Sequence, residues 1–257
     1  MEDGDSKTYA INLIWGGKLP SMGDFVWSEA GTLPRACLDN WLQTGVRQLH
    51  LTLGNNWESR FNCGLLWNFI VPAGVLGAGC VAGCISPSCD RVGRRFPFVV
   101  AYGFSPDAPV WYLLKAVDAV PNLLTRTGVL LFHGIRRQWP QQTLTTLIQD
   151  ARVKWQESLV PMEPDKLNAL GKDSVILDVL MGEGGGNPLP GNDEVSTVPG
   201  DRFATLPWHD AASSLVAKSA TTFWWTNGVG GAALKAFTYG VHLDGTLMTW
   251  LFGRPQT

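Results

Sequence analysis

The chain lacks an excess of charge of either sign, because its 257 residues include 20 Lys and Arg against 22 Asp and Glu. A net charge of −2 provides no basic field to attract a nucleic acid or an anionic lipid surface. Long apolar runs are also missing, since Gly, Pro or charged residues interrupt each one before the ~20 residues that a membrane span needs. We therefore expect no nucleic-acid partner and no membrane insertion.

The chain shows no sign of a secretory leader and has few cysteines. Its first residues, Met1-Glu-Asp-Gly-Asp-Ser6, are acidic, whereas a leader begins with a basic region and an apolar run. Five cysteines are an odd number, which argues against a disulfide framework. These absences favour a cytoplasmic location.

Three of the cysteines, Cys80, Cys84 and Cys89, lie close enough in sequence to suggest a thiolate metal site. The Cys-x2-Cys spacing of such sites is missing, and no histidine follows within about forty residues. Buried structural cysteines are the favoured interpretation. We predict no metal and no cofactor.

Catalytic motifs are scarce as well. Gly16-Gly17-Lys18 looks like part of a phosphate-binding loop, but Asn12 and Leu19 stand where that motif needs Gly and Ser or Thr. There is no Gly-x-Ser-x-Gly, and the four histidines have no evident triad partners. We predict no catalytic residues and no enzymatic activity.

What the chain does contain is a succession of apolar strands and amphipathic helices. Helical spacing of apolar residues predicts helices over Pro34–Leu53 and Pro140–Glu157, and a helical region over Pro109–His133 that is broken near Pro121. The Gly/Pro-rich stretch 182–200 predicts a mobile loop. Strands are expected at Tyr9–Trp15, Phe25–Trp27, Leu65–Val71, Gly79–Ile85, Phe98–Phe104, Thr221–Trp225, Ala233–Tyr239 and Leu247–Phe252.

This order of elements predicts the α/β class, with one mixed sheet and helices on both of its faces. No internal repeat is evident, and we expect a single domain over residues 1–257. The oligomeric state is left open by the sequence.

The most polar stretch next to a strand is Ser86-Pro-Ser-Cys-Asp-Arg-Val-Gly-Arg-Arg-Phe-Pro-Phe98. Its polar side chains must satisfy one another or a partner, because an apolar strand follows directly. Asp24 and Asp90 are candidates for a carboxylate pair, but the favoured interpretation is that Asp24 closes a turn and Asp90 pairs with Arg91 or Arg94. Guanidinium groups here also suit an anion.

The doublet Trp224-Trp225 lies on a predicted strand, so the two rings point to opposite faces. We expect one ring to belong to the core and the other to be exposed. An exposed tryptophan is a natural anchor for a binding partner.

Taken as a set, several blocks resemble the TagF (ImpM) family of proteins that accompany bacterial type VI secretion systems. The resemblance covers Gly16–Phe104 and, more weakly, Ala220–Gly240. The matching blocks are Gly17-Lys-Leu-Pro-Ser-Met-Gly-Asp-Phe25, Asp39-Asn-Trp-Leu-Gln-Thr-Gly45, Leu53-Gly-Asn-Asn-Trp57, Trp67-Asn-Phe69, Pro72-Ala-Gly74, Ser86–Pro97 and Thr222-Phe-Trp-Trp-Thr-Asn-Gly228.

The resemblance implies a three-layer α/β/α sandwich and a non-catalytic, post-translational repressor of type VI secretion assembly. Its implied partner is the forkhead-associated scaffold protein of that system. We expect the loops Lys18–Asp24 and Ser86–Arg95 to lie near each other. The structural or partner-binding candidates are Lys18, Ser21, Asp24, Ser88, Asp90, Arg91, Arg94, Trp224 and Trp225.

A rival hypothesis from another class uses the same Asp and Arg residues. In it, the protein binds a small anion or hydrolyses a substrate in a deep pocket. A pocket that contains Asp24, Asp90 and the arginines is what this alternative requires.

Overall fold

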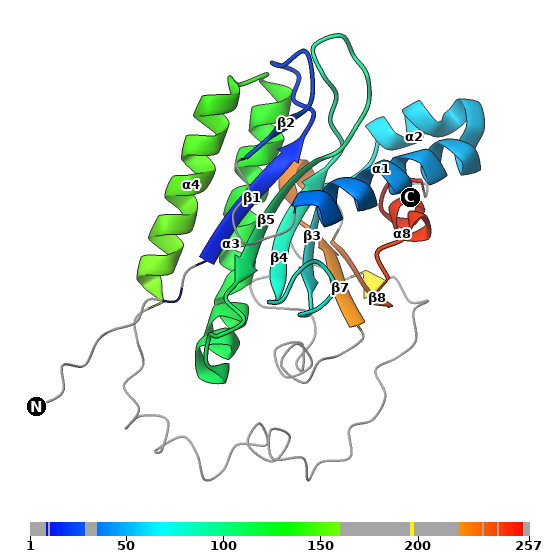
Figure 1. The fold of residues 1–257 in the computed structure, drawn as a ribbon. Coiled ribbons are helices and arrows are strands. Elements are labelled where there is room, and N and C mark those ends of the chain that lie inside the picture. The colour runs from blue at the N-terminus through cyan, green and yellow to red at the C-terminus, as the bar shows by residue number, and fades with distance from the viewer. Residues whose placement is uncertain are drawn as a thin grey trace, which may run out of the picture.

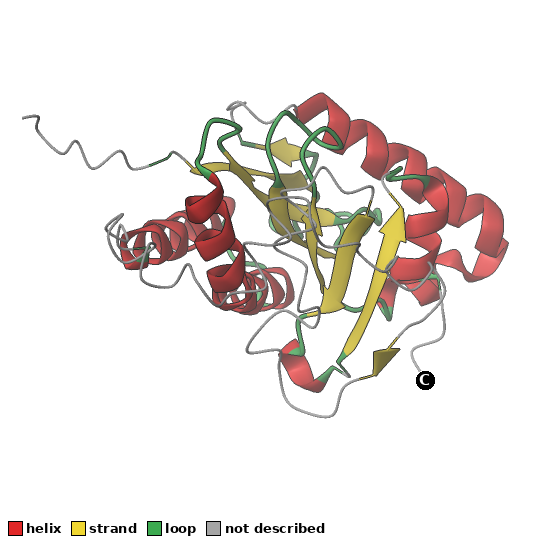
Figure 2. Ribbon diagram, turned by 90° about the horizontal axis from the view of Figure 1, so that it is seen from below, coloured by secondary structure: helices red, strands yellow, loops and turns green. Residues whose placement is uncertain are grey.

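A computed structural model describes Tyr9 and residues 11–28, 35–159, 196–197, 221–232, 234–240 and 242–253. Within these ranges the chain forms one central sheet with helices on both sides (Figures 1 and 2). The predicted α/β class is therefore confirmed. The predicted loop 182–200 lies outside the described residues, apart from Ser196–Thr197.

Among the described residues, the sheet contains eight strands in the order β2-β1-β5-β4-β3-β7-β8-β6. Its middle strands are almost entirely buried, because helices cover both faces. The strands are β1 (Ile11–Gly17), β2 (Val26–Trp27), β3 (Trp67–Val71), β4 (Val81–Ser86), β5 (Phe98–Phe104), β6 (Ser196–Thr197), β7 (Thr221–Thr226) and β8 (Lys235–Gly240).

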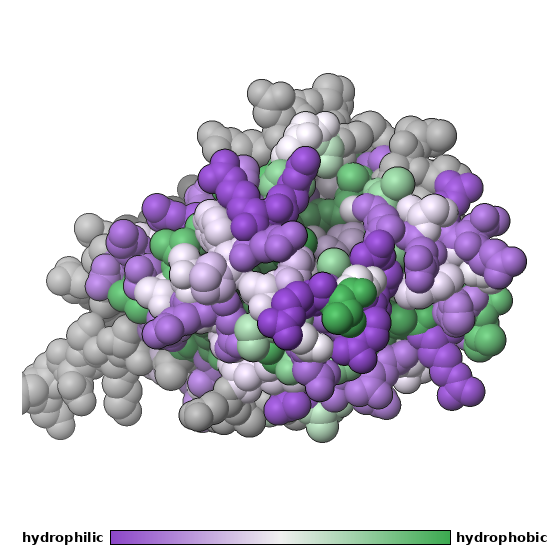
Figure 3. Space-filling model, turned by 90° about the horizontal axis from the view of Figure 1, so that it is seen from above, coloured by the Kyte–Doolittle hydropathy of each residue, from purple (hydrophilic) through white to green (hydrophobic). Residues whose placement is uncertain are grey.

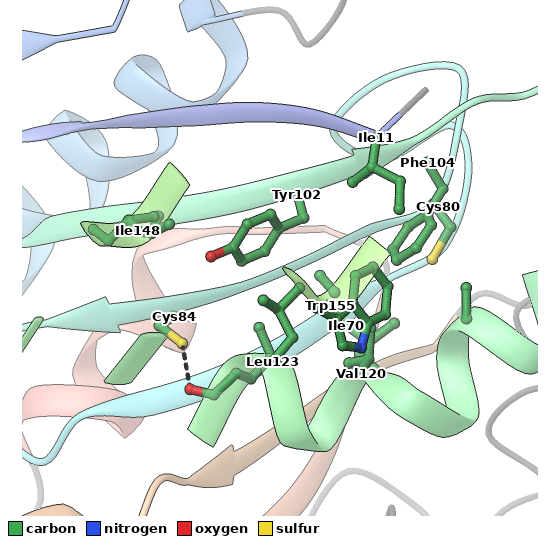
Figure 4. Close-up of a cluster of buried hydrophobic side chains, with 14 of the residues drawn as sticks. Ile11, Ile70, Cys80, Cys84, Tyr102, Phe104, Val120, Leu123, Ile148 and Trp155 are labelled. Atoms are coloured by element: carbon green, nitrogen blue, oxygen red, sulfur yellow. Dashed lines mark hydrogen bonds between the residues drawn. The ribbon is translucent and has the colours of Figure 1, made fainter. Parts of the chain in front are cut away.

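One face of the sheet packs against α3 (Val110–Arg136) and α4 (Gln141–Ser158). Figure 4 shows Tyr102 of β5 and Cys84 of β4 pointing into this layer, toward Leu123 and Ile148 of the two helices. Cys84 donates a hydrogen bond to the Leu124 carbonyl of α3 (Sγ···O 3.4 Å). The side of α3 that faces the sheet is thus held to β4 by a hydrogen bond as well as by apolar packing.

The opposite face packs against α1 (Arg35–Leu53), α2 (Trp57–Asn62) and α8 (Gly245–Phe252). A 3-10 turn at Gly54–Asn56 joins α1 to α2. Gly45 lets α1 and α8 approach closely, since a Cβ there would lie 2.8 Å from the Met248 Cε. Helices from the two ends of the chain therefore form one layer (Figure 1).

Three predictions about elements were wrong. All pairings among the described strands are antiparallel, so the sheet is not mixed. The helix α3 runs through Pro121 without a break, because both of its halves pack on the same layer and compensate for one missing hydrogen bond. Leu247–Phe252 belongs to α8 and not to a strand, because Asp244 caps this helix and its buried residues recur at helical spacing.

Candidate functional site

The loops Lys18–Asp24 and Ser86–Arg95 meet at one end of the sheet, and we call them the two-loop cluster. The first loop follows β1 and the second joins β4 to β5, which is the strand that pairs with β1. Gly17 makes the close approach possible: its φ is 124°, and a Cβ there would lie 2.1 Å from the Pro97 carbonyl oxygen. The predicted proximity of the two loops is therefore confirmed.

The carboxylate of Asp90 is the centre of the cluster, and its side chain is fully buried. One oxygen, Oδ1, accepts hydrogen bonds from the backbone N–H groups of Val92 (3.1 Å) and Arg94 (2.9 Å). The other, Oδ2, lies 3.1 Å from Lys18 Nζ and accepts from Arg94 Nε at 2.6 Å. Both oxygens are thus occupied by donors from the chain itself.

These contacts determine the protonation state of Asp90. Burial acts to raise the pKa of the carboxyl, but the hydrogen bonds from Arg94 and Lys18 and the Lys18 charge outweigh it and lower the pKa to about 2. Asp90 is therefore ionised over the whole physiological range, which makes it a weak general base.

Further hydrogen bonds join the two loops directly. The Ser88 hydroxyl donates to the Lys18 carbonyl (2.6 Å), and the Arg91 backbone N–H donates to the Met22 carbonyl (2.8 Å). Arg94 Nη2 donates to the Gly23 carbonyl at 2.9 Å. These hydrogen bonds connect the two loops at several points. They hold the backbone of the cluster in one arrangement in the absence of a partner.

The remaining loop candidates differ in exposure. Asp24 is exposed and accepts from the N–H of the next residue (2.8 Å), and no contact among the described residues joins its carboxylate to Asp90. Arg91 is exposed to solvent, and Val92 is also exposed, with a relative solvent exposure of 71 %. Within the described chain the buried Ser21 hydroxyl has no hydrogen-bond partner. The structure brings the loops together but does not form the predicted carboxylate pair.

The two tryptophans of β7 do point to opposite faces, yet both are buried. Trp224 packs with Trp41 and Phe69 in the layer of α1 and α8, whereas Trp225 faces α3 and α4. Their exposures are 0 % and 1 %. The predicted exposed anchor is therefore wrong, because helices cover this central strand on both faces.

Sequence reasoning missed two features of the site. The first is the pairing of Lys18 with Asp90, which no local pattern signals. The second is aromatic: Lys18 Nζ lies 4.8 Å from the centre of the Phe25 ring, which makes an edge contact with Phe96. These rings border a groove of about 500 Å³, which is lined by Phe25, Gln43, Val46, Arg47, His50, Trp57 and Phe96.

The chemistry that this arrangement supports is recognition. Guanidinium groups and apolar side chains are exposed around it, while its one buried carboxylate is saturated with donors. The groove does not include Asp90. Across the described ranges, no three His, Cys, Asp or Glu side chains gather as metal ligands would. In the same ranges, no helix is both long and apolar enough to cross a membrane.

Comparison with solved structures finds a similar fold in PA0076 from Pseudomonas aeruginosa PAO1, known from its crystal structure. The identity is 22 %, the match covers 96 % of each chain, and the TM-score is 0.50. At this identity the likeness bears on the fold alone. A search of curated proteins gives no match.

A family model provides the stronger finding. The model of the TagF N-terminal domain, described as type VI secretion system-associated, matches residues 15–151. That range holds the two-loop cluster, α1 to α3, most of α4, the whole of β2 to β5 and the end of β1. It is also more than half of the chain, and the protein therefore belongs to the TagF N-terminal domain family, which is associated with type VI secretion.

Proposed function

We propose that this protein is a non-catalytic, post-translational repressor of type VI secretion assembly that binds a forkhead-associated scaffold protein. The family match supports the link with secretion. The observation that carries the binding role is the Ser86–Arg95 loop, which internal hydrogen bonds and ion pairs hold in place while Arg91 and Val92 are exposed. The proposal includes action in the cytoplasm.

A rigid loop suits a binding function for a thermodynamic reason. Association must offset the entropy of ordering mobile segments, and a loop that is already braced loses little on binding. Val92, at 71 % exposure, offers an apolar contact next in sequence to the exposed Arg91. Figure 3 shows a small apolar patch surrounded by hydrophilic side chains on the face viewed from above, the end of the molecule at which the β4–β5 loop projects in Figure 1.

The rival enzyme hypothesis has less support. A general base needs a pKa near the working pH and a free lone pair, whereas Asp90 has a pKa of about 2 and accepts bonds on both oxygens. Asp24 is exposed and is not part of the groove lining. Both observations favour a binding protein over a hydrolase.

The test is co-purification of the tagged protein from a host that expresses the complete secretion gene cluster, with mass spectrometry of the recovered proteins. We expect the scaffold protein with the wild type and its loss with Val92→Asp and Arg91→Glu, which alter exposed side chains. Lys154→Glu on α4 is the control, since it reverses an exposed charge on the other side of the sheet.

The same variants allow a functional readout. Overproduced wild-type protein should suppress secretion of a type VI substrate, and the two loop variants should restore it while their thermal unfolding stays unchanged. Recovery of no secretion component with the wild type would contradict the proposal and direct attention to a small anion as the ligand.

A further inference from the structure

The groove beside the two-loop cluster joins elements that are distant in sequence. Phe25 and Phe96 lie at the ends of the two loops, Val46 and Arg47 come from α1, and Trp57 begins α2. The proposed function by itself assigns no role to this groove. Its apolar lining and its position next to the exposed arginines make it the strongest unassigned surface among the described residues.

The aromatic wall of the groove is held in place from behind. Phe25 is 43 % exposed, and its ring makes an edge contact with Phe96 at 4.8 Å between centroids. The Lys18 ammonium lies 4.8 Å from the same ring and is itself paired with Asp90. On the α1–α2 side, His50 makes an edge contact with Trp57 at 5.0 Å. A ring that is both exposed and fixed can receive an apolar side chain at little entropic cost.

The segments that supply the groove lining carry a net charge opposite to that of the rest of the chain. Residues 16–28, 35–62 and 86–97 hold seven Lys and Arg against four Asp and Glu, a net +3, so a whole-chain charge of −2 leaves −5 elsewhere. One of those four acids, Asp90, is buried and already shared by two cations. The basic residues are Lys18, Arg35, Arg47, Arg60, Arg91, Arg94 and Arg95, and the acidic ones are Asp24, Asp39, Glu58 and Asp90.

One of these cations lines the groove, and a second lies against the loop that leads to Phe25. Arg47 is an exposed member of the lining. Arg91 lies over Gly23, where a Cβ would be 3.3 Å from its Nη2, and Gly23 is two residues before Phe25. A segment in the groove would therefore have guanidinium groups on the α1 side and on the loop side.

We propose that this groove is the docking site for an acidic segment of the protein partner. An apolar side chain of that segment inserts between Phe25 and Trp57, and its carboxylates face Arg47 and Arg91. The inference rests on the proposed function, which supplies the partner. Complementary charge accelerates encounter and excludes basic partners, while the buried apolar anchor provides most of the binding energy.

The test uses the full-length protein and the purified scaffold protein, with the dissociation constant measured by calorimetry at low and high salt. Phe25→Ala should weaken binding about tenfold or more, as removal of a central anchor does. Arg47→Glu should weaken it by a similar factor and reduce its salt dependence. Because Arg47 is exposed, this second variant keeps the test valid if Phe25→Ala unfolds.

Matched controls come from α4, on the other face of the sheet. Val153→Ala removes an apolar side chain of similar exposure, 38 %, and Lys154→Glu reverses an exposed charge. Both should bind within about twofold of the wild type.

The experiment distinguishes failure of the groove assignment from failure of the proposed function. If the wild type binds the scaffold and the Phe25→Ala and Arg47→Glu variants bind it equally well, this inference is overturned and the proposed function stands. The inference is equally overturned if these variants only dissociate a dimer of this chain. Failure of the wild type to bind the scaffold overturns the proposed function and the groove assignment together.

Discussion

At the scale of single residues, Asp90 connects the local turn with the distant loop. Its Oδ1 accepts two backbone N–H groups of its own turn, and its Oδ2 joins Lys18 to Arg94. Buried ion pairs of this kind add little net stability compared with apolar residues, but removing one partner leaves the other charge buried and unpaired. Asp90 therefore acts as a determinant of loop geometry.

Replacement of Asp90 by Asn tests this role. We expect the free energy of unfolding to fall by about 3 kcal/mol, because Lys18 loses its counter-charge while its side chain stays only 8 % exposed. Urea denaturation measures the loss. Asp24→Asn is the matched control and should change the value by less than about 0.5 kcal/mol, since Asp24 is exposed. Equal effects of the two variants would refute the central role of Asp90.

The same carboxylate makes stability depend on pH on the acid side. Its folded-state pKa of about 2 lies below the unfolded value of ~3.9, so the folded protein binds fewer protons in this interval. The stabilising contribution is complete above about pH 4 and is lost as the pH falls toward about 2. The melting temperature of the wild type should therefore fall more steeply between about pH 4 and pH 2 than that of Asp90→Asn. Parallel curves would contradict the low pKa.

At the scale of elements, the end of the chain shows how capping selects a helix. Asp244 accepts the Leu247 N–H (3.0 Å) at the start of α8 and also accepts the Tyr239 hydroxyl (2.8 Å). Burial, together with the hydrogen bond to Asp244 and the negative charge of that carboxylate, raises the pKa of Tyr239 to about 12. The cap thus links α8 to β8.

Asp244→Ala should destabilise the protein by about 1 kcal/mol, the usual effect of losing an N-cap. The decrease in the denaturation midpoint measures this effect. Asp244→Ser should retain most of the stability, because serine can also cap a helix but lacks the charge near Tyr239. If the alanine and serine variants were equally destabilised, the cap would not be the reason that α8 forms.

At the scale of the whole molecule, segments near the C-terminus pack against segments from the N-terminal half of the chain. The edge of β3 pairs with β7, and the Trp67 indole donates to the Leu251 carbonyl of α8 (3.0 Å). Trp224 fills the space between Trp41 and Phe69. The region that matches the family model therefore depends on the C-terminal strands and helix to complete its core, above all in the layer of α1 and α8.

A fragment of residues 1–159 should consequently fail to fold cooperatively, although it contains the matched range 15–151. It lacks β7, β8 and α8, so the apolar face of β3 and the inner side of α1 would be exposed. We expect binding of a hydrophobic dye and loss of the near-ultraviolet circular dichroism of the tryptophans, with the full-length protein as the control. A sharp unfolding transition of the fragment would show that the N-terminal part is independent.

Most element positions were predictable from the sequence, since hydrophobic periodicity is local. The strand at Phe98–Phe104 was predicted with its observed bounds, and α1 and α4 within a residue or so. Periodicity was insufficient for Leu247–Phe252, because a short apolar run suits either a strand or a helix. It also failed to predict that α3 would continue through Pro121, a result that depends on packing.

The sequence by itself determined the α/β class, the opposite directions of Trp224 and Trp225, and the need of the polar side chains in the Ser86–Arg95 loop for hydrogen-bonding partners. Those properties follow from local periodicity and from the cost of burying unpaired polar groups. Only the tertiary structure decided that Lys18 pairs with Asp90, that both tryptophans are covered, and that Phe25 meets α1 at a groove. Such features depend on distances across the sheet between segments far apart in the chain, and no local pattern encodes those distances.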